Sequence, residues 1–169
     1  MFAGTGTVAG LTQVELVDYL QKADTRWFEN DSCQRVRINV DLVPKNVQGA
    51  IRVFYSCSTR ILETHDLTYW VFETQDKAID HFSELQGRVT EELGSAKFIL
   101  PGGQEEDDGA TVSIFTNDFM RSTHIVARAQ NVVLLVEVDG GNKSDSEYHF
   151  LFGHGLLSDG LNNLYRAKG

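Results

Sequence analysis

The sequence predicts a single α+β domain, with a mostly antiparallel sheet of about six or seven strands packed with two or three helices. The chain has 169 residues, the usual length of one domain, and 41% of them are hydrophobic, enough for one core without a metal or other staple. Segments that alternate apolar and polar residues are separated by tight turns, which favour antiparallel pairing. Segments with apolar residues every three or four positions predict helices near the start, the middle and the end.

The first third of the chain predicts a helix followed by three strands. Residues 1–10 are glycine-rich and uncharged, so we expect a flexible lead-in or linker, with residues 11–169 forming the domain. Thr12 and Glu15 form a capping box that begins a helix extending to about residue 23. Alternation over residues 36–42 and 51–57 predicts an antiparallel hairpin, and the aromatic run at 67–73 predicts a third strand.

The rest of the chain predicts a long helix, four further strands and a final helix. Thr74 caps the long helix, whose apolar positions recur from Ala78 to Leu93. Strand-like segments follow at 97–100, 110–116, 123–129 and 132–138, with an acidic hairpin tip at 105–109. A second capping box at 144–147 begins the last helix. Its three glycines, at 153, 155 and 160, either break this helix or allow it to pack closely on the sheet.

The charge balance limits the classes of partner. The chain has 24 acidic against 15 basic residues, a formal net charge of -9, whereas nucleic acids and anionic membranes are bound by clustered cations. It also lacks an apolar run of about 18 residues, so we expect no direct membrane insertion by this chain. We therefore expect a small ligand or a protein partner, and the oligomeric state stays open.

The two cysteines are placed where a disulfide is possible. Cys33 and Cys57 fall at the start of one predicted hairpin strand and the end of the other, and these positions lie close together across an antiparallel ladder. A disulfide there predicts an extracytoplasmic or secreted location, because such bonds persist in oxidising compartments. The alternative is two independent buried thiols in a cytoplasmic protein.

No motif for catalysis or metal binding stands out in the sequence. The five histidines form no helical pair with metal-ligand spacing, there is no Cys-x-x-Cys, and the acidic tip lacks the spacing of a calcium loop. No nucleophile motif is present either, and Cys57 has no neighbouring base. We therefore predict no catalytic residue, no metal site and no cofactor, and favour a binding domain over an enzyme.

Two segments are apolar at successive positions, which is unusual for a sheet with one face in water. These are residues 69–72 and 132–136. The simpler interpretation is that helices cover both faces of the sheet. The other is a binding surface, for which the candidate residues are Arg37, Arg52, Phe54, Tyr69 and Leu135.

Three features together resemble a known family. They are the run at 128–138 followed by Gly140, Gly141 and a final helix, the aromatic strand leading into a helix at 71–82, and the early cysteine pair. In these the chain resembles the extracytoplasmic sensor domains of actinobacterial serine/threonine kinases and related lipoproteins of PsbP-like fold. The resemblance implies an α/β sandwich outside the membrane that binds a ligand or partner without catalysis of its own.

The leading interpretation is thus a non-enzymatic, sensor-like binding domain outside the cytoplasm. A second is a small cytosolic α+β enzyme or binding protein of cone shape, with an enclosed pocket into which groups such as Asp41, His124 or Tyr69 would project. A third is an inhibitor or immunity-type protein whose acidic surface binds a basic protein.

Overall fold

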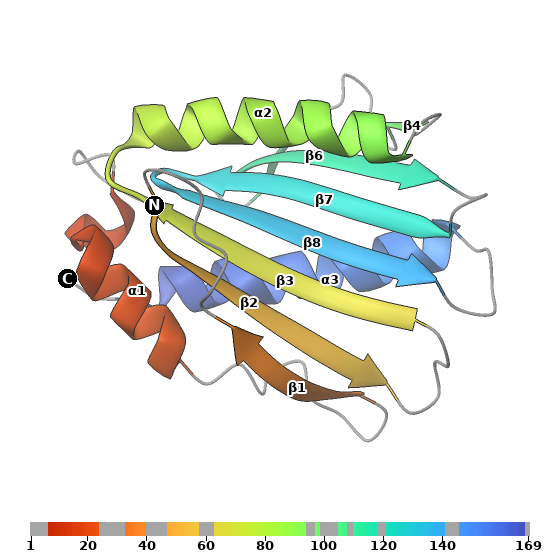
Figure 1. Cartoon of the computed structure of the whole chain (residues 1–169), viewed down its shortest axis with the longest axis horizontal. Helices are drawn as coiled ribbons and strands as arrows, with labels where there is room; N and C mark the ends of the chain where they lie inside the picture. Colours follow the sequence, from red (N-terminus) through yellow and green to blue (C-terminus); the bar gives the residue numbers. More distant parts are fainter. Residues whose placement is uncertain are drawn as a thin grey trace.

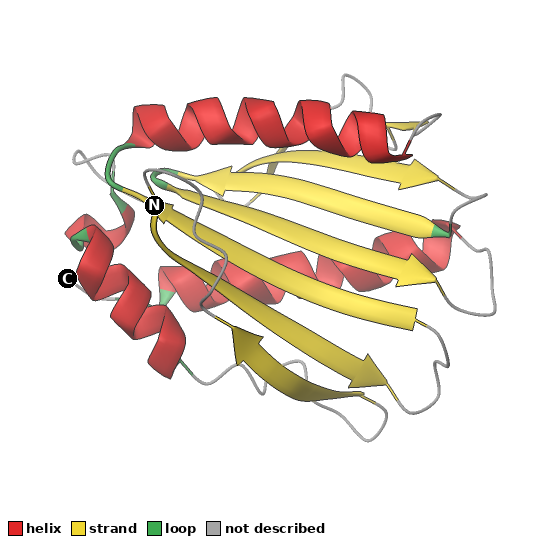
Figure 2. Cartoon of the chain, viewed as in Figure 1, coloured by secondary structure: helices red, strands yellow, loops and turns green. Residues whose placement is uncertain are grey.

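An antiparallel sheet with helices on both of its faces forms the molecule (Figures 1 and 2). The structure, a computed structural model, describes residues 7–23, 33–39, 47–57, 63–93, 97–98, 105–107, 110–117, 121–140 and 146–167. Within them lie a short 3-10 helix and three α-helices: η1 (Val8–Gly10), α1 (Gln13–Lys22), α2 (Gln75–Leu93) and α3 (Ser146–Tyr165). The predicted number of helices is confirmed.

The described residues form eight strands. They are β1 (Cys33–Asn39), β2 (Val47–Cys57), β3 (Glu63–Phe72), β4 (Lys97–Phe98), β5 (Glu105–Asp107), β6 (Ala110–Asn117), β7 (Ser122–Ala129) and β8 (Val132–Gly140). The order across the sheet is β1-β2-β3-β8-β7-β6-β4, and β5 also pairs with β6. The α+β class and the antiparallel pairing are confirmed. The strand count of six or seven is too low, because residues 105–107, expected in a solvated tip, pair with β6.

Helices cover both faces of the central strands. On one face α1 and α3 pack over the side chains of Leu67, Tyr69, Leu134 and Val136 in one buried cluster. On the other face α2 packs over a second cluster, which includes Trp70, Val133 and Leu135. Strands β3 and β8 are therefore apolar on both faces because each face carries its own core.

The turn between β7 and β8 is short and ties three segments together. Ala129 pairs with Val132, so only Gln130 and Asn131 connect the strands, and Gln130 takes the left-handed φ of 52°. The buried Asn131 amide accepts from the Val8 backbone N–H at 2.9 Å and donates to the Phe72 carbonyl at 2.8 Å. Residues 7–10 are therefore not a free lead-in, because Val8 is buried and held by this amide.

The C-terminal helix is continuous, and two of its glycines face the sheet. A Cβ at Gly160 would lie 3.1 Å from Leu67 Cδ2 and 3.2 Å from the Tyr69 hydroxyl. That hydroxyl donates a hydrogen bond to the Gly160 carbonyl at 3.2 Å. Of the two expectations for the glycines, close packing is thus the one the structure shows. Among the described residues, no atom outside the backbone of this helix lies within 4 Å of the Cβ position of Gly155.

We predict that Gly160→Ala and Gly155→Ala change stability in opposite directions. The methyl group at position 160 overpacks the contact with Leu67 and Tyr69, which costs about 1–3 kcal/mol. At position 155 the methyl group meets open space, so the helix gains up to about 1 kcal/mol. Urea unfolding followed by circular dichroism measures both changes. Equal effects of the two substitutions would contradict the close packing at Gly160.

Candidate functional site

A groove runs between α2 and the sheet. Its cavity volume is about 240 Å³, and eight residues line it: Thr68, Trp70, Leu85, Arg88, Val89, Glu92, Leu135 and Glu137. Strands β3 and β8 supply the floor, and α2 supplies the wall, including one cationic and one anionic side chain a helical turn apart. The lining thus combines apolar surface with a few charged groups, as ligand sites do.

The position of α2 explains why a groove is left beside it. Figure 1 shows α2 along the β6 and β7 side of the sheet, with β1 and β2 on the far side of the central strands. Two side-chain contacts hold it there: Gln86 donates to the Ser113 hydroxyl, and Asn117 donates to the Leu93 carbonyl. One helix about 10 Å wide covers roughly two strands, and the groove lies where α2 meets β3 and β8.

The floor of the groove contains a buried indole with an unpaired donor. Trp70 is 6% exposed, and its Nε1 has no hydrogen-bond partner among the described residues. His81 of α2 packs edge-on against this ring, with ring centroids 5.1 Å apart, and lies at the same distance from Phe72. Burial lowers the pKa of His81, with Glu84 opposing and Arg88 adding to that effect.

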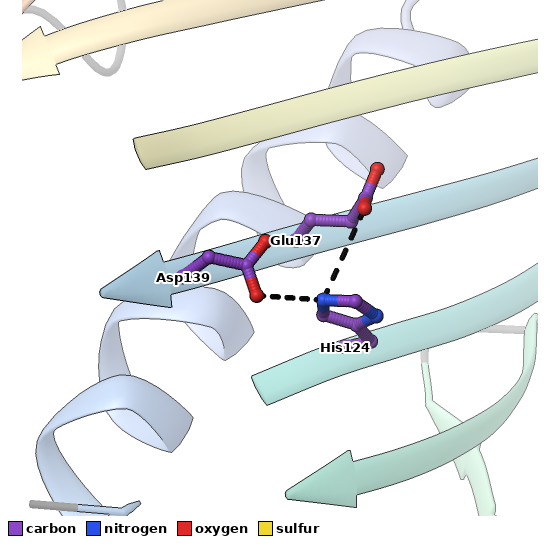
Figure 3. Close-up of side chains that lie close together, drawn as sticks. All are labelled: His124, Glu137 and Asp139. Carbon is purple, nitrogen blue, oxygen red and sulfur yellow. Dashed lines mark hydrogen bonds and ion pairs between the residues drawn. The ribbon is translucent and has the colours of Figure 1, made fainter. Parts of the chain in front are cut away.

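Next to the groove, one histidine and two carboxylates lie together (Figure 3). His124 Nε2 is 2.9 Å from Asp139 Oδ1 and 3.9 Å from Glu137 Oε2. His124 lies on β7 directly opposite Glu137 of β8, and Asp139 is two residues further along β8, so all three project from one face. Glu137 also lines the groove, which makes the cluster continuous with it.

The surroundings of His124 favour the protonated, positively charged form of its imidazole. Burial lowers the pKa of His124, but the hydrogen bond to Asp139 and the negative charges of Asp139 and Glu137 outweigh it. The net effect is a raised pKa, to which the charge of Glu92 on α2 also contributes. Asp66 of β3 lies directly opposite Glu137 on its other side and adds a further acidic residue to this region.

The structure separates some of the residues proposed for a binding surface. Tyr69 is buried in the core under α1 and α3, whereas Leu135 belongs to the α2 face and lines the groove. Residues alternate in a strand, so these two face opposite sides of the sheet and do not share a site. The side chains of Arg37, Arg52 and Phe54 lie outside the described part of the structure, although Arg52 is the register partner of Thr68.

The cysteines are opposed across the first hairpin. Cys33 and Cys57 are Cα partners in the register of β1 and β2, as their predicted positions at the strand ends require. Cα atoms of directly opposed residues lie about 4.5–5.5 Å apart, which is within the range that a disulfide spans. Their bond stays a prediction.

Sequence analysis missed the grouping of His124, Glu137 and Asp139. A signal for it was present, because strands 123–129 and 132–138 were both predicted with two residues between them. Counting back from a two-residue turn pairs His124 with Glu137. The metal-ligand spacings that can be read along a sequence are pairs on one helix and short motifs. Neither of them includes residues on two strands of a hairpin.

The comparisons with known proteins add a structural neighbour. No family model matches the chain, and no curated protein matches it. Among solved structures it is similar to the extracellular domain of PknH from Mycobacterium tuberculosis, with 93% of each chain aligned, 11% identity and a TM-score of 0.49. This neighbour is an extracellular domain, as are the sensor domains that the sequence resembles. No described helix is long and apolar enough to cross a membrane.

We predict that His81 makes the protein less stable in mild acid. The folded state holds the pKa of His81 below its ordinary value of 6.5, so below that pH the unfolded chain binds the proton more readily. The loss begins near pH 6.5 and continues until the pH falls below the lowered pKa. His81→Phe keeps a ring against Trp70 and removes the titration. The free energy of unfolding of the variant relative to the natural protein should rise as the pH falls from 7 to 5.

The comparison of the two proteins between pH 7.5 and 9 serves as the control. His81 is neutral in both the folded and the unfolded state there, so the difference should not change with pH. A difference that stays constant down to pH 5 would show that His81 titrates as it does in the unfolded chain.

Proposed function

We propose that this chain is a non-enzymatic, sensor-like domain that binds a small ligand, or a short segment of a protein partner, in the groove beside α2. The observation that carries the proposal is Trp70, which lines that groove and whose buried indole N–H has no hydrogen-bond partner among the described residues. A buried donor without a partner costs about 1–3 kcal/mol. A ligand with an acceptor atom would recover this loss.

The lining of the groove indicates the chemistry of the ligand. Arg88 and Glu92 lie one turn apart on α2 and both line the groove. Leu85, Val89 and Leu135 supply apolar surface between them and the sheet. A ligand with an apolar body and polar groups of both signs fits this lining better than a purely ionic or purely apolar one.

The positions of the acid/base candidates support binding over catalysis in an enclosed pocket. His124 lies on the α2 face of the sheet, and Tyr69 lies in the core on the other face. Two groups separated by a sheet cannot act on one substrate atom. Asp41, the third candidate, lies outside the described residues.

The proposed location is outside the cytoplasm, and it rests on the cysteine pair. The backbone register that places Cys33 opposite Cys57 supports a disulfide clip between β1 and the neighbouring strand. Strand β1 is at the edge of the sheet, where such a bond limits fraying.

We predict that small amphipathic molecules bind in the groove. The probe is a fragment library of aromatic and aliphatic amino-acid derivatives, screened by two-dimensional NMR of the ¹⁵N-labelled full chain. Hits should shift the amide signals of Thr68, Leu85, Val89 and Leu135, because these residues line the groove. The same hits should leave residues under α3, such as Leu161, unchanged.

Two adjacent glutamates on α2 give a matched control for these hits. Glu92→Gln removes a charge from the groove, whereas Glu91→Gln removes the same charge from an exposed position that does not line it. Affinity should fall several-fold in the first variant, about 1 kcal/mol for a charged contact, and stay unchanged in the second. Hits that map elsewhere, or that both variants bind equally well, would count against the groove. New signals from a hit after incubation would contradict the non-enzymatic assignment.

We predict that Cys33 and Cys57 form a disulfide in protein produced under oxidising conditions. Alkylation without reductant should leave the mass of the denatured chain unchanged, and alkylation after reduction should label both of its cysteines. Cys33→Ser with Cys57→Ser should lower the free energy of unfolding by roughly 3.5 kcal/mol for a loop of about 25 residues. Two thiols that label readily without reductant would remove the argument for an oxidising compartment.

A further inference from the structure

We propose that His124, Glu137 and Asp139 form a binding site for a divalent transition-metal ion of the zinc class, at the end of the groove beside α2. The three donor atoms lie within 4.8 Å of one another on two neighbouring strands. The proposal stands independently of whether the groove binds an organic ligand.

The distances suit a single small ion. Zn–N and Zn–O bonds of about 2.0–2.2 Å place the ligand atoms of a tetrahedral ion roughly 3.4 Å apart. The separations from His124 Nε2 are 2.9 Å to Asp139 Oδ1 and 3.9 Å to Glu137 Oε2, one slightly below and one slightly above this value. Small rotations of the two carboxylates therefore bring all three atoms to one ion.

The donor set and its charge also favour a divalent transition metal. Two carboxylates and a neutral imidazole supply two anionic oxygen donors and one nitrogen donor, a set that suits a divalent transition metal. Imidazole favours zinc-class ions over calcium or magnesium, which prefer oxygen ligands alone. The ion takes the lone pair of Nε2 in the neutral tautomer whose ring proton is on Nδ1. Where the ring starts as imidazolium, the second proton, which Nε2 donates to Asp139, passes to solvent.

The supporting structure is rigid, and the site is accessible. The imidazole is 7% exposed and fixed on a strand paired on both sides, so only its Nε2 edge faces the carboxylates (Figure 3). The side chains of Glu137 and Asp139 are 25% and 35% exposed, which gives an ion a path from solvent. Three protein ligands leave a fourth position for water or for a ligand donor.

Zinc titration of the full, tag-free chain after removal of metals with a chelator tests the site. Isothermal calorimetry should find one strong Zn²⁺ site per chain. Asp139→Asn and Glu137→Gln, which preserve size and remove one ligand charge each, should weaken Zn²⁺ binding at least about tenfold. Glu91→Gln, an exposed carboxylate on α2, should leave it unchanged.

A second measurement identifies the nitrogen ligand. Long-range ¹H–¹⁵N spectra should show the His124 Nε2 signal moving on addition of Zn²⁺, whereas the signals of His154, on the α3 side of the sheet, stay in place.

Circular dichroism verifies that each variant is folded. The proposal would be overturned by the absence of a strong Zn²⁺ site, by Zn²⁺ affinity in both carboxamide variants equal to that of the natural chain, or by binding of Ca²⁺ in preference to Zn²⁺. Fragment binding measured with chelator present tests the groove separately.

Discussion

The structure depends on the pairing of β3 with β8, two central strands that are apolar on both faces. Every residue of β3 from Leu67 to Phe72 is buried, so neither face can remain in water. Among the described residues, α1 and α3 cover one face and α2 covers the other. A single helix is narrower than the sheet that it covers (Figure 2). The groove is lined by residues of this helix and of β3 and β8.

The hairpin of β7 and β8 determines the chemistry at the end of that groove. Its two-residue turn leaves no freedom in register, because a shift by one residue would move each side chain to the other face. The register that buries Val126 and Leu135 under α2 also places His124 opposite Glu137. The acidic and basic groups are therefore held by the same packing that forms the core, so the cluster needs no separate support.

The two layers differ in the residues that they pack against the sheet. Helix α3 has glycines against the strands, so its backbone lies close enough for Tyr69 to donate a hydrogen bond to its Gly160 carbonyl. Helix α2 instead packs the large side chains Phe82, Leu85 and Val89 against the sheet. The groove lies in this layer.

The sequence by itself determined the class of fold, the three helices with the Thr12 capping box, and the strand ends on which the cysteines lie. These features depend on periodicity and on residues a few positions apart, which are visible along the chain. It did not determine that β5 pairs with β6, that Tyr69 and Leu135 face different layers, or that His124 meets Asp139. Those outcomes depend on which strands become neighbours and where α2 lies across them, and the tertiary structure decides both because they minimise the exposed apolar area of the whole chain.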